Sequence, residues 1–410
     1  MQLNNDVYQI QNLNVLEICE QYGSPLYVYD ADIIIRQIQN FKSAFSEVPL
    51  KIKFACKALT NISILRLMKL NGIGIDTVSV NEARLGILAG FEPREINYTP
   101  NGVAFEEIIE AVELGIKINI DNIPSLEKFG KKYGNSVSCG LRLNPHVVAG
   151  GNSKIQVGHI NSKFGISVSQ LSEVHELIKK YNIKVAGLHI HTGSDILEAE
   201  AFITGASVVF GVAKDFKDLA YIDFGGGFKV SYKEGDKTTN IPDLGKKLSA
   251  AFKEFCKEYG KELELWFEPG KYLVSECGYL FVKTNVVKQT PNLTFLQVNS
   301  GLNHLIRPMM YDAYHDILNV SNPNGKKETY NVVGYICEND TFGNNRLLNE
   351  VREGDTLVLK NAGAYSFSMS SQYNARVRPA EVLIYKGKAI LIRERETLDD
   401  ILKNQILVDL

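Results

Sequence analysis

Several features that mark common classes of protein are absent from this chain of 410 residues. No run of about eighteen apolar residues exists to form a membrane-spanning helix. The first residues, Met1 to Asp6, lack the basic and then apolar stretches of a secretory signal. The net charge of −2 comes from interspersed charges of both signs without a basic block, which argues against a surface for nucleic acid or anionic membrane. These absences predict a cytoplasmic protein whose partner is a small molecule.

Cysteine is scarce and scattered. The six cysteines form no Cys-x-x-Cys pair and have no histidine at metal-binding spacing, so we expect free thiols in a reducing compartment, with no disulfide framework and no metal site. Nucleotide signatures are missing too, because neither a P-loop nor Gly-x-Gly-x-x-Gly occurs.

Apolar strand patterns alternate with helical patterns through residues 29–275, many of the latter ending at Gly or Asn. Eight parallel strands, each followed by a helix, describe a (β/α)₈ barrel, with an open doubly wound sheet as the alternative. The predicted strands are Ile52–Ala55, Ile73–Val78, Glu95–Thr99, Ile116–Ile120, Cys139–Asn144, Val185–His191, Ala220–Phe224 and Leu263–Phe267. The predicted helices include Asn81–Ala89, Phe105–Leu114, Ser125–Tyr133, Gln170–Lys180, Glu198–Asp215 and Leu244–Tyr259.

The pattern changes after Ser275. β-Branched and aromatic runs without long helices between them predict a separate antiparallel β domain at 276–410, a β-sandwich or barrel. Its predicted strands are Gly278–Val287, Thr329–Ile336, Thr356–Lys360 and Ala380–Tyr385. The N-terminal segment 1–28, with a short helix at Leu13–Gly23 and an aromatic run from Pro25 to Asp30, is expected to pack with that domain. The fold class is therefore α/β plus β.

Lys57 stands where the first predicted barrel strand ends, directly before an amphipathic helical segment. Catalytic groups of such barrels cluster at the carboxyl ends of the strands, and a lysine there can form a Schiff base. A solvated surface lysine is the alternative. Asp76 and Arg142 lie at the ends of the second and fifth strands, and Ser79 with Glu82 fits a helix capping box.

Three more strand ends carry suitable groups. Alternation places His189 and His191 on one face of the sixth strand, as core histidines or, for His191 especially, as a site residue. Gly225, Gly226 and Gly227 follow the seventh strand, either as a tight turn or as a cradle for an oxyanion. Glu268 emerges from the apolar eighth strand and needs a cationic partner, which could be a protonated pyridine nitrogen, Lys271 or Arg142.

Together these groups fit pyridoxal 5'-phosphate (PLP), whose aldehyde, ring face, phosphate and ring nitrogen each need one of them. The chain also resembles the fold-type III PLP-dependent decarboxylases with an alanine racemase-like barrel, and among them the diaminopimelate decarboxylase branch. The resemblance rests on these stretches: Phe54–Ala58, Gly74–Asp76 with Ser79 and Glu82, Lys163–Ile166, His189–Ser194, Gly225–Gly227, Glu268–Gly270, Leu305–Pro308 with Tyr311, Cys337–Glu338, and Ser368–Asn374 with Arg378–Pro379.

The resemblance implies decarboxylation of meso-2,6-diaminopimelate to L-lysine and CO₂, the last step of lysine biosynthesis. It implies that Lys57 binds the cofactor as a Schiff base and that Cys337 donates a proton to the carbon that loses CO₂. The cofactor-binding residues it implies are Lys57, Asp76, His191, Ser194, Gly226, Gly227, Glu268, Gly270 and Tyr373. The substrate-binding residues it implies are Lys271, Arg307, Tyr311, Glu338 and Tyr373. It also implies a homodimer whose active sites lie at the interface.

Two departures from the family pattern stand out. Lys271 occupies a position where the family usually has arginine, and lysine lacks the bidentate fork. The stretch after Glu338 is shortened to Asn339-Asp340, which affects the substrate-end loop.

Other readings remain open on sequence alone. They are a decarboxylase of another basic amino acid or polyamine precursor (carboxynorspermidine, D-ornithine or D-lysine), a racemase on the same fold, and a non-catalytic PLP-binding homologue. Arg307 speaks against a substrate without a distal carboxylate, because a guanidinium facing it would have no partner.

Overall fold

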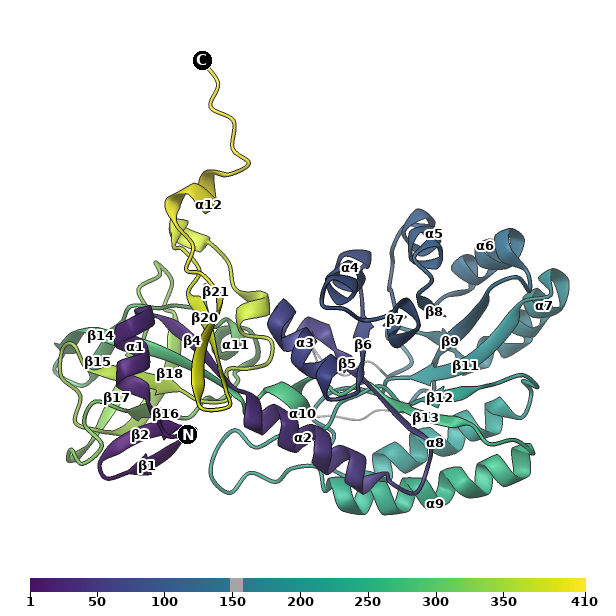
Figure 1. The fold of residues 1–410 in the computed structure, drawn as a ribbon, viewed down its shortest axis with the longest axis horizontal. Coiled ribbons are helices and arrows are strands. Elements are labelled where there is room, and N and C mark those ends of the chain that lie inside the picture. The colour runs from purple at the N-terminus through teal and green to yellow at the C-terminus, as the bar shows by residue number, and fades with distance from the viewer. Residues whose placement is uncertain (148–157) are drawn as a thin grey trace. The chain divides into compact units, whose positions relative to one another are not determined.

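The protein divides into two compact units in a computed structural model that describes residues 1–147 and 158–410 (Figure 1). Unit 1 consists of Met1–Ile34, Ser231–Asp236 and Val274–Leu410, and unit 2 of Ile35–Val230 and Lys237–Leu273. The short stretch Ser231–Asp236 thus belongs with the β-rich unit although barrel segments flank it in sequence. Each unit is described separately below.

Unit 2 contains a closed barrel of eight parallel strands. Each strand pairs in parallel with the next, and the last of them pairs with the first, so the sheet has no open edge. A short further strand, β10 (Ile166–Ser167), pairs with β9 outside this ring. All eight predicted strands are confirmed, as is the barrel. The strands are β5 (Leu50–Ala55), β6 (Gly74–Thr77), β7 (Ile96–Tyr98), β8 (Lys117–Ile120), β9 (Ser138–Asn144), β11 (Lys184–Ile190), β12 (Tyr221–Asp223) and β13 (Glu264–Phe267).

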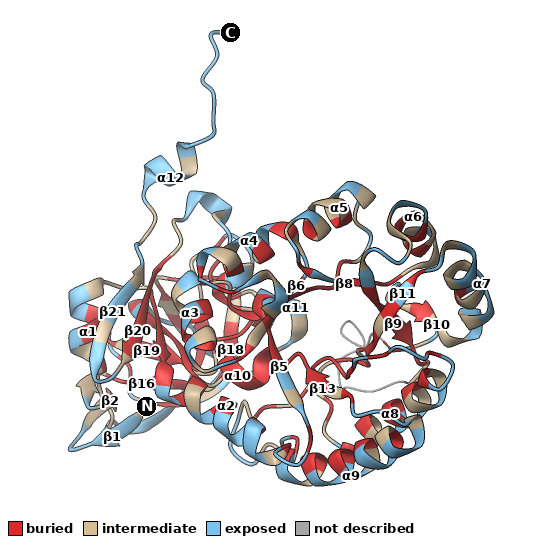
Figure 2. Cartoon of the chain, turned by 45° about the vertical axis from the view of Figure 1, so that its right-hand side comes forward, coloured by how far each residue is buried: buried red, intermediate tan, exposed pale blue. Residues whose placement is uncertain are grey.

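A helix follows each barrel strand. Capping residues define the ends of these helices. The Asn61 side chain accepts from the Ser63 N–H at the start of α3, and Gly260, in the left-handed region, ends α9. Figure 2 shows buried residues on the inward side of α8 and α9 and exposed ones on the outward side. The helices are α3 (Ile62–Leu70), α4 (Val80–Leu88), α5 (Phe105–Glu113), α6 (Ile123–Tyr133), α7 (Leu171–Tyr181), α8 (Ala199–Ala213), α9 (Ile241–Tyr259) and α10 (Lys271–Val274), and α2 (Ala31–Ala44) precedes β5.

Aromatic stacking fills one layer of the barrel interior. The rings of Tyr221 and Trp266 stack with centroids 3.7 Å apart, and the ammonium of Lys117 lies 4.5 Å from the Trp266 ring centre. Gly187 makes this layer possible, because a Cβ there would lie 2.2 Å from the Tyr221 ring. The barrel is a packed core and not a pore.

Unit 1 is built on a second sheet in the order β18-β17-β15-β14-β4-β20-β21, in which β19 also pairs with β14 and β16 pairs with β19. Most neighbours are antiparallel, as predicted, but β4 pairs with β20 and β15 with β17 in parallel. The N-terminal strand β4 lies between β14 and β20, so the N-terminal segment is part of this sheet. The strands are β4 (Leu26–Asp30), β14 (Gly278–Gln289), β15 (Thr294–Val298), β16 (Ile317–Asn319), β17 (Lys327–Val333), β18 (Thr341–Asn349), β19 (Thr356–Leu359), β20 (Ala380–Tyr385) and β21 (Lys388–Arg393).

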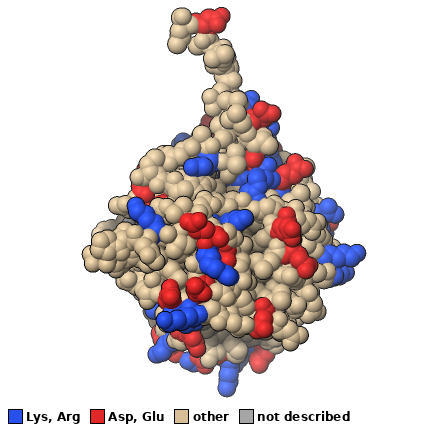
Figure 3. Space-filling view, turned by 90° about the vertical axis from the view of Figure 1, so that its left-hand side faces the viewer, with Lys and Arg blue, Asp and Glu red and all other residues tan. Residues whose placement is uncertain are grey.

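Smaller elements complete unit 1. A three-stranded sheet precedes the first helix, and two short helices lie in the C-terminal part. They are β1 (Gln2–Asn4), β2 (Val7–Ile10), β3 (Leu13–Asn14), α1 (Val15–Tyr22), α11 (Arg307–Tyr311) and α12 (Leu398–Leu402). The face in Figure 3 carries basic and acidic side chains interspersed. Among the described residues no helix is both long and apolar enough to cross a membrane.

One predicted strand is too long. Thr329–Ile336 was expected to be extended throughout, but β17 ends at Val333. The Gly334 N–H turns to the carbonyl of Asp340 at 2.8 Å and leaves the sheet ladder. Cys337 and Glu338 therefore lie exposed in a loop.

The barrel layer predicts that Gly187→Ala destabilises the protein, because the new methyl group overlaps the Tyr221 ring. Overpacking of this kind costs about 1–3 kcal/mol. Gly211→Ala is the control: Gly211 is exposed on α8 with nothing within 4 Å of its Cβ position, and alanine there should stabilise the helix slightly. Thermal unfolding of both variants checks this, and equal melting midpoints would refute the packing argument.

Candidate active site

Lys57 lies on a turn of 3₁₀ helix, Cys56–Ala58, that begins where β5 ends. Its side chain is exposed. Its ammonium is close enough to contribute to the lowered pKa values of His191 and Glu268 and to oppose in part the raised pKa of Asp76. The structure therefore brings together four of the predicted residues, which come from four different strand ends of unit 2.

Glu268 forms a buried pair with His189. The His189 Nε2 lies 3.0 Å from the Glu268 Oε2, and the side chains are 1% and 8% exposed. Burial raises the pKa of Glu268, but His189 and the hydrogen bond to it outweigh burial and hold the pKa at about 2. The prediction that Lys271 or Arg142 is the partner of Glu268 is wrong. The hydrogen-bond partner of Glu268 is His189, and Lys271 pairs with Asp195.

Two further carboxyl groups lie beside this pair. Asp223 Oδ1 accepts from the Gly225 N–H at 2.9 Å, and ligand atoms of Asp223, His189 and Glu268 lie within 4.8 Å of one another. Asp76 Oδ1 accepts from the Thr99 hydroxyl at 3.1 Å. Burial and then the charge of Glu268 raise the pKa values of both aspartates well above 3.8. This environment therefore favours the ionised form of Glu268 and the protonated form of both aspartates.

The glycine turn after β12 passes close to two other backbone segments. A Cβ on Gly226 would lie 2.4 Å from the Glu268 carbonyl, and one on Gly227, whose φ is +111°, would lie 2.3 Å from the Gly193 carbonyl. Only glycine permits this approach. Ser194 is half-buried just beyond Gly193, and Gly270 is buried after β13.

His191 lies against the same turn, with its Nδ1 accepting from the Gly226 N–H at 3.3 Å. Burial, followed by the charges of Arg142 and Lys57, lowers the pKa of His191 well below 6.5. The ring is therefore neutral and carries its hydrogen on Nε2. A neutral imidazole suits packing against an aromatic ring.

Lys271, at the first position of α10, is 8% exposed and forms an ion pair with Asp195. Lysine needs only one such acceptor, whereas the arginine usual in the family presents a fork of donors. The ammonium of Lys271 therefore has its anionic partner within unit 2.

Unit 1 holds a second group of candidates around Arg307. This residue begins α11 and is 6% exposed. Its guanidinium lies 4.9 Å from the Tyr232 ring centre, and its Nη1 lies 3.4 Å from the His315 Nε2. No carboxylate forms an ion pair with Arg307 within residues 1–147 and 158–410. Tyr311 is half-buried at the other end of the same helix.

Cys337 and Glu338 have partners from the loop at 373–374. The Tyr373 hydroxyl donates to Glu338 Oε1, and the Asn374 side-chain amide lies 2.9 Å from the Cys337 sulfur. The shortened stretch after them is a tight turn in which the Asp340 N–H bonds to the Glu338 carbonyl at 2.7 Å. Asp340 Oδ2 also accepts from the Leu302 N–H at 3.2 Å.

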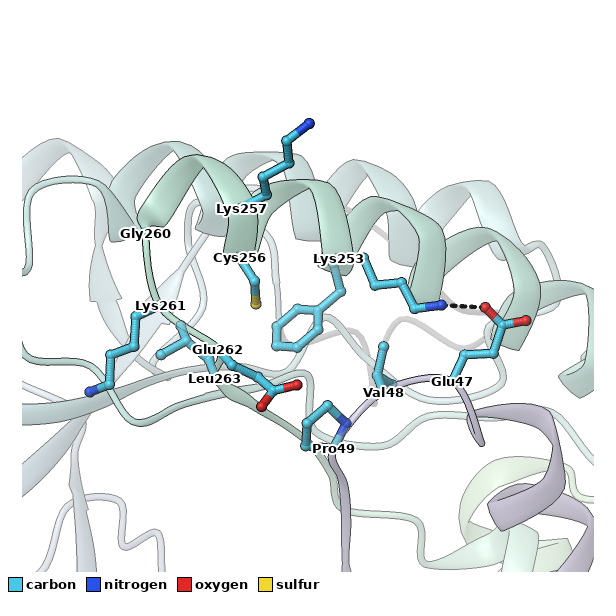
Figure 4. A pocket seen from close by; sticks show the side chains of 11 residues that line it. Glu47, Val48, Pro49, Lys253, Cys256, Lys257, Gly260, Lys261, Glu262 and Leu263 are labelled. Carbon is cyan, nitrogen blue, oxygen red and sulfur yellow. Dashed lines mark hydrogen bonds and ion pairs between the residues drawn. The ribbon is translucent and has the colours of Figure 1, made fainter.

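A cavity of about 500 Å³ also opens on unit 2 (Figure 4). Residues before β5 and β13 and the end of α9 line this cavity. It therefore lies at the amino ends of the barrel strands, opposite the end that carries Lys57 and Glu268. Figure 4 shows an ion pair between Lys253 and Glu47 at its edge and the Cys256 thiol within. Active sites of barrels lie at the other end.

Comparison with known proteins identifies the family. The profile described as "Pyridoxal-dependent decarboxylase, pyridoxal binding domain" matches residues 31–275. The chain is 36% identical to the diaminopimelate decarboxylase of Methanothermobacter thermautotrophicus, over 97% of this chain and 95% of that protein. The chain belongs to the diaminopimelate decarboxylase family.

Solved structures agree with this family assignment. A diaminopimelate decarboxylase from M. jannaschii superposes with a TM-score of 0.91 at 31% identity, covering 99% of this chain and 98% of that one. The Helicobacter pylori diaminopimelate decarboxylase in complex with L-lysine gives a TM-score of 0.88 at 32% identity, covering 95% and 98%. The family uses PLP as its cofactor.

The residues of unit 2 fit PLP. Glu268 Oε1 is buried and accepts no hydrogen bond from the described residues, although the neighbouring Asp223 carboxyl group helps to lower the pKa of Glu268, while Oε2 is held by His189. A buried ionised oxygen needs a positively charged donor, and a protonated ring nitrogen is one. The glycine turn can bring backbone N–H groups to a phosphate, and Lys57 can reach the aldehyde.

Sequence reasoning missed several residues of these groups. Asp223, Asn374, Tyr232 and His315 were not singled out, and His189 was ranked below His191. A signal existed for Asp223, which directly precedes the glycine turn at a strand end. Tyr232 carried none, and Asn374 only as part of the stretch Ser368–Asn374 that supports the resemblance, because the contacts of both residues join segments far apart in the chain.

The protonated state of Asp223 predicts a change in pH dependence. Its folded pKa lies above its unfolded value near 3.8, so wild-type stability falls as pH rises above about 4, by up to about 1.4 kcal/mol per pH unit for this group. In Asp223→Asn the amide can replace the carboxyl group and has no proton to lose. We expect the melting temperature of the cofactor-free variant to fall less than that of wild type between pH 5 and 8. Asp218→Asn, at an exposed site, is the control and should follow wild type; equal slopes for all three would show that Asp223 is ionised.

Proposed function

We infer that this protein decarboxylates meso-2,6-diaminopimelate to L-lysine and CO₂ with PLP, the last step of lysine biosynthesis. Membership of the family supports the reaction class. The observation that carries the choice of substrate is the buried Arg307 guanidinium without a carboxylate partner in the described chain. A buried cation of this kind is costly unless an anion meets it.

The distal carboxylate of the substrate is that anion. Meso-diaminopimelate has one carboxylate at each end, and the product keeps the one that is not released. Binding of that retained group by Arg307, with Tyr311 on the same helix, favours this substrate over ornithine or lysine, because each of these has only the one carboxylate that decarboxylation would remove. Glu338, whose Oε1 accepts from Tyr373, has a second oxygen to accept from the distal ammonium.

The residues of unit 2 have separate tasks in this proposal. Lys57 holds the cofactor covalently, and the neutral His191 packs on the ring face. Ser194, Gly226, Gly227 and Gly270 hold the phosphate. Glu268, fixed by His189, keeps the proton on the ring nitrogen. When bound, PLP supplies a ring that accepts the electron pair left by the departing CO₂.

Cys337 has the task of proton delivery. Loss of CO₂ breaks one carbon–carbon bond, and the same carbon must gain one proton to give lysine. The exposed thiol of Cys337, held by the Asn374 amide at 2.9 Å, is suited to deliver it.

The proposal includes a homodimer in the cytoplasm. Cys337, Glu338 and Tyr373 are all exposed on unit 1, which supports a site completed by a second copy of the chain. All six cysteines are free thiols in the structure, which supports a reducing compartment.

The direct test is incubation of the PLP-loaded protein with meso-diaminopimelate while CO₂ and L-lysine are measured together. We expect equal amounts of both. The matched variant Lys57→Ala should lose more than about a hundredfold in turnover, since proton transfer by such a group alone is worth about 10²–10⁴, and should lose the visible absorption of lysine-bound cofactor. A Lys57→Ala protein with wild-type turnover would show that the site is wrongly assigned.

Cys337→Ala tests the proton donor separately. We expect turnover slowed by about a hundredfold with the cofactor still bound, because the thiol is assigned to the reaction and not to PLP binding. Absorption of bound PLP and single-turnover release of CO₂ and lysine distinguish these roles. Loss of PLP from this variant, with turnover restored by added cofactor, would contradict the assignment.

A further inference from the structure

His315 is the contact of Arg307 that has no assigned role. It lies four residues after α11 and two residues before β16, and it is fully buried. Its Nδ1 is 2.9 Å from the Lys360 carbonyl, and its Nε2 is 3.4 Å from Arg307 Nη1. Both ring nitrogens are therefore engaged.

These two contacts determine where the hydrogen on the ring lies. A carbonyl oxygen only accepts, so Nδ1 must carry the hydrogen and donate it to Lys360. Burial, followed by the charge of Arg307, lowers the pKa of His315 to about 3, so the ring is neutral at working pH. Nε2 is then a lone-pair acceptor that faces the guanidinium.

The guanidinium is thereby held on two sides. The Tyr232 ring lies 4.9 Å from it, and this ring is itself fixed by a 3.1 Å hydrogen bond between its hydroxyl and Ser275. Neither Tyr232 nor His315 is an anion, so the positive charge of Arg307 is oriented without being neutralised. An aspartate or glutamate at position 315 would compete with the substrate for the same cation.

We propose that His315 is a positioning residue that sets the specificity for a distal carboxylate, by accepting from one edge of the Arg307 guanidinium and directing the rest of its donors toward the substrate. This inference rests on the proposed function, and it assigns to His315 the geometry on which carboxylate selection depends.

Three variants separate the two contacts of the ring. His315→Asn keeps an amide donor near the Nδ1 position, for Lys360, and removes the acceptor at Arg307. His315→Gln places an amide oxygen near the Nε2 position and retains the acceptor. His315→Leu removes both contacts at similar volume. Thermal unfolding and PLP absorption establish that each variant is folded and loaded.

L-Lysine and cadaverine are the matched probes, because they differ only by the carboxylate. Calorimetry with the PLP-loaded protein should show that wild type prefers L-lysine. Loss of a hydrogen bond to a charged group should reduce that preference by about tenfold in His315→Asn and His315→Leu, with cadaverine binding unchanged. His315→Gln should keep most of the preference, and KM for meso-diaminopimelate should rise in the first two variants more than kcat falls.

The outcomes separate this inference from the proposed function. If wild type neither decarboxylates meso-diaminopimelate nor prefers L-lysine over cadaverine, the proposed function fails. If wild type does both, but His315→Asn and His315→Leu keep the wild-type preference, the positioning role is refuted. Equal loss of preference in all three folded variants, Gln included, would also overturn it, because the acceptor would then not be what matters.

Discussion

The structure of the barrel site depends on how three buried carboxyl groups are accommodated at one end of the strands. Asp76, Asp223 and Glu268 are each at most 8% exposed, and three negative charges in such a space would repel strongly. His189 stabilises the charge on Glu268 alone, while burial and then the charge of Glu268 raise the pKa values of the other two and favour their protonated forms. The site therefore presents a single negative charge with one oxygen, Oε1, left for a donor.

This arrangement also links the charge to the glycine turn. Asp223 bonds to the Gly225 N–H, and the Glu268 N–H bonds to the Gly225 carbonyl at 2.6 Å. Glu268 and the glycine turn, to which we assign the ring nitrogen and the phosphate, are thus connected through Gly225. In the proposed site the ends of the adjacent strands β12 and β13 would position both ends of the cofactor, which would give a rigid basis for catalysis.

Much of this fold was predictable from the sequence, because the barrel strands are short apolar runs separated by helices with clear stop signals. Lys57, His191, Gly226 and Glu268 could be found because each ends such a run. The partner of Glu268 could not, since it depends on the register that sets His189 opposite Asp223 in the neighbouring strand. The periodicity of a strand predicts which face of the sheet a side chain lies on, but it does not predict which residue of the adjacent strand lies beside it.

The second sheet was harder to predict for a similar reason. Its strands were located by composition, yet the parallel pairing of β4 with β20 joins segments more than three hundred residues apart in the chain. The end of β17 at Val333 depends on a hydrogen bond from Gly334 to Asp340, which no local pattern encodes. Cys337 and Glu338 lie in the loop after this bond, and although both residues were predicted, their contacts with Asn374 and Tyr373 could not be, because these contacts are long-range.

Under the proposed function, the lysine at position 271 leaves recognition of the distal carboxylate to Arg307. Its single ammonium is paired with Asp195, a residue in the left-handed region at φ +60° on the loop after β11. An arginine at position 271 could make the same ion pair and still have N–H groups left to bind a carboxylate. Lysine has no planar pair of N–H donors for this purpose. Arg307 is the candidate that combines burial, a full set of planar donors and the lack of an anionic partner in the described chain. In the proposed function, substrate choice then depends on how rigidly unit 1 orients that one guanidinium, and so on the neighbours of Arg307 as well as on its charge.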